Sequence, residues 1–281
     1  MQSIYKSWLT HISFSLYLFY SSLLIGWQIV SFLFFYQDIN QNEIIIRLNH
    51  WTVFQPYIIG PGIILTILFI IFKSIRNIKN SEFSRRLKKQ IYLNSGFLGI
   101  LLLDIVLYNA EISIHALRLV TFFISLWMLN RWGNFLSKSE IPAWQHPTTY
   151  GAFVVAALLN GCALLGLLNI IDFKNSTVLY YILVLLLFDL FIIYARFRFL
   201  SKSNQVLNKI ARDLFGSQLI QFGMRIIIGI FMPLIFILYS LLINAEGNEG
   251  IGVLILTGTF LDRYLFVISG IGYYTGDKNT G

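Results

Sequence analysis

The chain has 281 residues, of which 57% are hydrophobic and only 12% are charged, and its mean hydropathy is +0.70. Soluble domains carry about 25% charged residues, so this composition excludes a disordered chain and argues strongly against a soluble enzyme with one buried core. We therefore expect an all-α integral membrane protein, a helical bundle that forms a single polytopic domain over residues 1–281.

Eight segments are predicted to be transmembrane helices, because about 20 mostly apolar residues are needed to cross the hydrocarbon core. In chain order they cover residues 8–36, 54–72, 91–110, 113–130, 148–171, 178–195, 218–244 and 251–274. The first apolar run is too long for the hydrophobic region of a signal peptide, so we interpret it as a retained span.

Basic residues are distributed unevenly between the two sets of loops that these spans define. The side with both termini carries sixteen of the 21 basic residues: Lys6, Lys73, Arg76, Lys79, Arg85, Arg86, Lys88, Lys89, Arg131, Lys138, Arg196, Arg198, Lys202, Lys209, Arg212 and Lys278. The opposite loops carry only Arg47 and Lys174. The positive-inside rule therefore places both termini in the cytoplasm, and no nucleic acid is needed to explain the net charge of +8.

Two further patterns concern the membrane surface. The basic segments 78–91 and 203–217 have apolar residues at i, i+4 spacing, and we predict short interfacial helices there, with attraction to anionic lipid headgroups favoured over a dock for a soluble subunit. Tryptophans near the predicted interfaces are typical of an aromatic belt. These are Trp8, Trp51, Trp127, Trp132 and Trp144.

Six ionisable residues fall inside the predicted spans, where a charge costs at least about 2.5–3.5 kcal/mol at the helix centre and so marks candidate function. They are Asp104, Arg118, Asp189, Arg225, Asp262 and Arg263. Asp189 and Arg225 lie near the same end of consecutive spans, and we predict that they form a structural ion pair. Adjacent helical residues point about 100° apart, so Asp262 and Arg263 are not expected to neutralise each other.

Arg263 lies in the middle of the last span, on one helical face with Thr259. It needs a partner on another helix, a quinone-like carbonyl or water, and a structural and a functional role remain equally open. His115 is predicted to lie on the outer side with Asp104, where the two are candidates for binding a quinone or passing protons. No two histidines share a helix face, so we expect no haem. The sequence also lacks a metal-ligand motif, a phosphate loop and a nucleophile elbow, so no metal and no catalytic residue is predicted.

Two stretches resemble the membrane anchor subunit of dimethyl sulfoxide reductase, the DmsC family. Residues 141–153 (IPAWQHPTTYGAF) resemble its Pro-x-Trp entry into the fifth span, and residues 258–266 (GTFLDRYLF) resemble its Gly-Glu-x-x-Gly-Arg-x-x-Phe segment in the last span. Thr259 replaces the usual Glu and Asp262 the usual Gly. The family also often carries a histidine just after span two, and residues 72–76 contain none. The related NrfD/PsrC-type anchors are an alternative family.

The resemblance implies a membrane anchor that exchanges electrons with menaquinone in anaerobic respiration, in a bacterial or archaeal cytoplasmic membrane. Its partners would be a four-cluster iron–sulfur subunit and a molybdopterin catalytic subunit, and the anchor would contain no metal. Whether the anchor itself oxidises quinol or is non-catalytic stays open. The quinone-binding residues expected on this view are Arg263, Thr259, Asp262, Asp104 and His115. Two other classes are a transporter or ion channel that uses the intramembrane charges, and an integral-membrane enzyme acting on lipid.

Overall fold

A computed structural model of the chain describes residues 2–37, 59–62, 64, 82–109, 115–173, 175–203, 205–243 and 250–276. All of the regular elements in these ranges are helices. They are α1 (Gln2–Gln37), α3 (Glu82–Asn109), α4 (His115–Ser137), a 3-10 turn (Pro142–Trp144), α5 (Pro147–Leu167), α6 (Ser176–Lys202), α7 (Gln205–Phe215), α8 (Leu219–Ile226), a π-helical segment (Ile227–Phe231), α9 (Met232–Ile243) and α10 (Gly250–Gly276).

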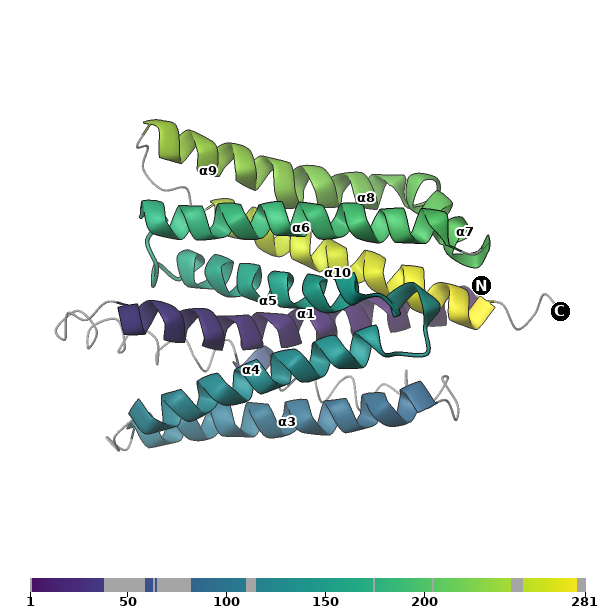
Figure 1. The fold of residues 1–281 in the computed structure, drawn as a ribbon. Helices are drawn as coiled ribbons and strands as arrows, with labels where there is room; N and C mark the ends of the chain where they lie inside the picture. The colour runs from purple at the N-terminus through teal and green to yellow at the C-terminus, as the bar shows by residue number, and fades with distance from the viewer. Residues whose placement is uncertain are drawn as a thin grey trace.

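The long helices lie roughly side by side in layers (Figure 1). Helices α3 and α4 form one side of the bundle, α1, α5 and α10 its middle, and α6, α8 and α9 the other side. The first span is 72% buried inside the protein and the span in α5 67%, whereas the span in α6 is only 33% buried. One face of α6 therefore exposes apolar residues, including Leu187, Phe188 and Phe191, as expected for a helix in contact with lipid.

Five of the described helical segments are long and apolar enough to cross a membrane: His11–Phe34, Pro147–Leu167, Ser176–Lys202, Leu219–Ile243 and Gly250–Gly270. The prediction of an all-α, multi-pass membrane protein is confirmed at this level. The predicted spans 91–110 and 113–130 coincide with parts of α3 and α4, which are helical but are not among these five. Most of the predicted span 54–72 lies outside the described residues.

The two predicted interfacial segments differ in structure. Residues 205–215 form the separate helix α7, which buries Leu207, Ile210 and Leu214 and exposes Lys209 and Arg212. In the other segment, the described part from Glu82 onward is the first three turns of α3 and continues into the apolar part of that helix without a break. The segment is therefore not a separate short helix there.

Small residues allow α1 and α5 to pack in close contact. A Cβ atom on Gly26 would lie 1.6 Å from the carbonyl oxygen of Ala157, and one on Gly161 would lie 2.3 Å from the carbonyl oxygen of Gly26. Ala157 and Gly161 are small residues four positions apart on α5, a spacing that permits the close approach of two helices. At the same contact, the Asn160 side-chain amide donates a hydrogen bond to the hydroxyl of Ser22 at 3.0 Å.

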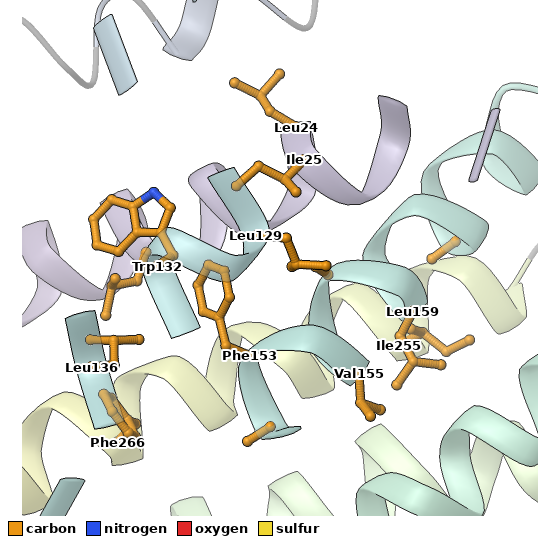
Figure 2. Packing of buried hydrophobic residues seen from close by; sticks show 14 of the residues in the cluster. Leu24, Ile25, Leu129, Trp132, Leu136, Phe153, Val155, Leu159, Ile255 and Phe266 are labelled. Carbon is orange, nitrogen blue, oxygen red and sulfur yellow. The ribbon is translucent and has the colours of Figure 1, made fainter. Parts of the chain in front are cut away.

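Two tryptophans lie in the core, not at the membrane interface. Trp132 and Trp144 are fully buried, whereas Trp127 is 45% exposed, so the aromatic-belt interpretation is wrong for the first two. Trp132 stacks on Phe153, with 6.1 Å between ring centroids, and Figure 2 shows the two side chains next to each other. Periodicity alone does not distinguish a tryptophan that faces lipid from one that faces a neighbouring helix.

Candidate functional site

Four charged side chains meet between α6, α8 and α10. Arg225 donates a hydrogen bond from Nη2 to Oδ2 of Asp189, and both residues are buried. The Nε atom of Arg225 lies 3.7 Å from Oδ1 of Asp262, and Nη1 of Arg263 lies 3.6 Å from Oδ2 of the same carboxylate. Asp262 therefore lies between two guanidinium groups. Its side chain retains 14% exposure, so it is the most accessible of the four.

The structure places Asp189 against Arg225, the pair predicted from the sequence. It also brings Asp262 and Arg263 together, although adjacent residues start on different helical faces. The arginine side chain is long enough to turn its guanidinium back toward the neighbouring carboxylate. The attraction between a carboxylate and a guanidinium in contact offsets part of the desolvation free energy that each buried charge costs.

Arg263 links α10 to the first turns of α5. Its Nη2 atom donates a hydrogen bond to the carbonyl oxygen of Ala152 at 3.1 Å. Its guanidinium lies over the ring of Phe153, 5.1 Å from the centroid, which is a cation–π arrangement. Nε of Arg263 is buried and has no hydrogen-bond partner within the described part of the chain.

Two glycines make room for the guanidinium of Arg225. A Cβ atom on Gly229 would lie 2.5 Å from Nη1 of Arg225 and 2.6 Å from Cα of Gly258. Gly229 belongs to the π-helical segment Ile227–Phe231, which starts two residues after Arg225. Such segments frequently occur at functional sites. Here the segment and the two glycines bring α8 and α10 close together around a buried charge.

Sequence reasoning missed Arg196, which it counted among the basic residues of a cytoplasmic loop. Helix α6 continues to Lys202, so Arg196 belongs to the helix and lies two turns after Asp189 on the same face. Its guanidinium lies over the ring of Phe266, 4.6 Å from the centroid. The spacing of seven residues between Asp189 and Arg196 is a signal that could have identified it.

A cavity of about 50 Å³ lies beside the charged cluster and is partly open to the surface. Its polar lining comes from Arg196, Arg225, Asp262 and Ser269, and seven of its eleven lining residues are apolar. This volume holds a few water molecules at roughly 10–15 Å³ each. Nε and Nη1 of Arg225 are buried without a hydrogen-bond partner among the described atoms. The site thus has donors to offer to a bound acceptor.

The other predicted site residues lie elsewhere. Thr259 is buried, and its hydroxyl donates a hydrogen bond to Oδ1 of Asn160 at 2.5 Å, toward α5. Asp104 is buried in α3, on the opposite side of the bundle from α6 and α8 (Figure 1). His115 begins α4, and its side chain lies outside the described residues. The structure does not bring Asp104 and Arg263 together, because their helices occupy different layers (Figure 1).

Within the described ranges, no three His, Cys, Asp or Glu side chains come together in a way that could hold a metal ion. No protein-family model matches the chain, and no curated protein matches it. The function is therefore inferred from the residues and their geometry.

Proposed function

We propose that this chain is the membrane anchor of a molybdopterin and iron–sulfur oxidoreductase complex, and that it exchanges electrons with the quinone pool. One observation carries the proposal. The two stretches with the family resemblance, 141–153 and 258–266, pack against each other although they are more than 100 residues apart in the chain. Trp144 hydrogen-bonds to Phe266 at 3.0 Å, and Arg263 hydrogen-bonds to Ala152 at 3.1 Å. A resemblance restricted to two segments in mutual contact favours a shared structural unit over chance.

We further propose eight spans with both termini in the cytoplasm. The start of α1, the start of α3, the end of α4, helix α7 and the end of α10 all lie at one end of the bundle (Figure 1). Exposed basic residues gather at these ends, including Arg85, Lys138, Lys202 and Lys209. This arrangement supports the orientation that the positive-inside rule predicts.

Asp262 and Arg263 are the residues that we assign to the quinone. The site fits such a headgroup in two respects. The buried Nε–H of Arg263 has no acceptor within the described part of the chain, and it can donate to a carbonyl oxygen. Asp262 keeps some exposure within an otherwise buried cluster, and its carboxylate can take up a proton from a quinol hydroxyl. Menaquinol would supply two electrons and two protons, and the partner iron–sulfur subunit would accept the electrons.

The proposal is tested by purifying the affinity-tagged full chain from native membranes in a mild detergent and identifying co-purifying proteins by mass spectrometry. We expect a ferredoxin-like iron–sulfur protein and a molybdopterin protein. Recovery of this chain alone, or only of copies of itself, would contradict the anchor function. The control for nonspecific capture is an unrelated multi-pass membrane protein that is tagged in the same way and purified from the same membranes.

The buried charges also favour a second candidate, an ion transporter or channel. Three ionisable side chains, Arg196, Arg225 and Asp262, line a partly open cavity, and Asp189 and Arg263 contact two of them. Intramembrane charges of this kind mark ion pathways in transporters. The discriminating measurement is ion flux into proteoliposomes that contain only the purified chain. Flux that disappears in Asp262→Asn would favour transport, and its absence together with recovered partner subunits would favour the anchor.

A further inference from the structure

The cavity beside Arg225 lies under the amphipathic helix α7. Its walls include Leu200 near the end of α6, Leu214 of α7 and Phe222 of α8. Helix α7 buries its apolar residues and exposes Lys209 and Arg212, an arrangement typical of helices that lie at the level of the lipid headgroups. The cavity is therefore close to one membrane surface, within reach of a lipid head.

The charges around this cavity do not balance. Three guanidinium groups face two carboxylates, which leaves one positive charge in excess when all five are ionised: Arg196, Arg225, Arg263, Asp189 and Asp262. Arg225 is 1% exposed, and its Nε and Nη1 atoms have no hydrogen-bond partner among the residues that the structure describes. Arg196 is half-buried, lies over the ring of Phe266 and has no ion-pair partner within the described part of the chain. A positive charge held away from water is costly unless an anion compensates it.

We propose that this cavity binds the phosphodiester head of an anionic phospholipid, with Arg196 and Arg225 as hydrogen-bond donors. A phosphodiester carries a single negative charge, which matches the excess, and its oxygens accept charge-assisted hydrogen bonds from guanidinium groups. A neutral carbonyl headgroup would leave the excess charge in place.

The apolar surroundings favour a lipid over a free ion. Seven of the eleven lining residues are apolar, and inorganic phosphate would lose its hydration there without an apolar part to bury. Just outside the cavity, Leu219 and Ile220 at the start of α8 are 50% and 75% exposed. They provide an apolar surface along which acyl chains can lie. This inference does not rest on the proposed function. Because Asp262 also lines this cavity, a lipid head here competes with the quinone assignment of Asp262, and the naphthoquinone competitor in the test decides between the two occupants.

The test uses the purified full chain in a mild detergent and native mass spectrometry. Dioleoyl phosphatidylglycerol and dioleoyl phosphatidylcholine are added in equal amounts, and inorganic phosphate or 2,3-dimethyl-1,4-naphthoquinone is added as a competitor. We expect one phosphatidylglycerol to be retained per chain under conditions that remove phosphatidylcholine, with no displacement by either competitor. Arg196→Gln should weaken retention about tenfold, as expected for loss of a charged donor. Arg198→Gln is the matched control, since Arg198 lies on the same helix and is exposed.

Several results would overturn the proposal. Displacement by the naphthoquinone would mean that the cavity takes a neutral carbonyl, and displacement by phosphate at equal concentration would mean that it takes a free anion. Equal retention of the two lipids, or equal effects of the two variants, would mean that no specific lipid site exists. If Arg196→Gln does not purify in folded form, a photoreactive phosphatidylglycerol is crosslinked to the unaltered chain. Labelling is expected within residues 196–222, and labelling only elsewhere would also refute the site.

Discussion

Trp144 donates a hydrogen bond from its indole nitrogen to the main-chain oxygen of Phe266, 122 residues later in the chain. The two rings are stacked, with centroids 4.5 Å apart and planes 11° apart. Trp144 thus links the segment between α4 and α5 to helix α10. Gly270 permits this contact, because a Cβ atom there would lie 2.2 Å from the indole nitrogen.

Loss of this contact should destabilise the bundle. Trp144→Phe removes the hydrogen bond while keeping an aromatic ring, and should cost about 1 kcal/mol. Trp144→Ala also leaves a cavity and should cost about 3–5 kcal/mol. The measurement is the thermal unfolding midpoint in detergent, followed by circular dichroism. Trp127→Phe is the control, since Trp127 is 45% exposed, and an equal shift in the control would argue against a special role for Trp144.

The pair of Asp189 and Arg225 provides a second prediction. Asp189→Asn leaves a buried guanidinium with only the longer contact to Asp262, and should cost about 3–5 kcal/mol of stability. The double variant Asp189→Leu with Arg225→Met should be more stable than the single variant, because it removes both charges and keeps the volume filled. Both are compared by thermal unfolding in detergent. A double variant no better than Asp189→Asn would mean that the unpaired charge is not the cause.

Gly229 and Gly258 lie so close together that we expect no larger side chain to fit at position 229 without strain. Gly229→Ala would place its Cβ atom 2.5 Å from the Arg225 guanidinium and 2.6 Å from backbone of α10, and should cost about 1–3 kcal/mol through overpacking. In Gly223→Ala the new Cβ atom meets nothing within 4 Å. This control should be neutral or slightly stabilising, because alanine favours the helix. Similar melting temperatures for the two variants would contradict the close packing around Arg225.

His146, which lies just before the span in α5, should make the stability of the chain depend on pH. It caps α5 by accepting a hydrogen bond from the backbone N–H of Thr148 at its Nδ1 atom, at 3.2 Å. Partial burial lowers its pKa below the ordinary 6.5, and the positive charge of Arg196 lowers it further. The folded state therefore binds this proton less readily than the unfolded state. The contribution to stability is fully present above pH 6.5 and is lost as the pH falls through the lowered folded-state pKa.

The check on this prediction is the melting temperature between pH 7.5 and 5. The unaltered chain should lose stability on acidification, whereas His146→Asn should lose less, because asparagine also caps helices and does not titrate. The effect should be modest, since the side chain is only partly buried. Parallel pH profiles for the two proteins would refute a role for His146.

Substitutions of Arg263 test the proposed electron exchange with quinone directly. If the anchor function holds, Arg263→Ala should lower quinol-driven turnover of the complex at least tenfold while the complex stays assembled at the membrane. Arg263→Lys should also keep the complex assembled, and it restores the positive charge but not the planar guanidinium contacts to Ala152 and Phe153. Activity is followed with a reduced naphthoquinol as donor and assembly by native electrophoresis. Loss of the whole complex from the membrane in Arg263→Ala would instead make the residue structural.

The helical class and the membrane character follow from the amino-acid composition and the long apolar segments. A chain this apolar must satisfy its backbone hydrogen bonds internally when it crosses lipid, and helices do so within each segment. The sequence also predicted the ion pair of Asp189 and Arg225. Consecutive spans are antiparallel, so the end of the first span lies beside the start of the second. Amphipathic spacing likewise predicted α7 from local residues alone.

The direction in which each helix faces depends on contacts between helices that are distant in the chain. Arg196 points into the bundle, Trp132 and Trp144 are buried, and Asp104 lies in a different layer from Arg263. A uniformly apolar helix has no strong periodic signal that fixes its rotation about its own axis. Rotation is set by contacts between distant segments, such as Gly26 with Ala157 and Gly229 with Gly258. These contacts, formed where small residues let backbones meet, place the charged cluster beside its cavity.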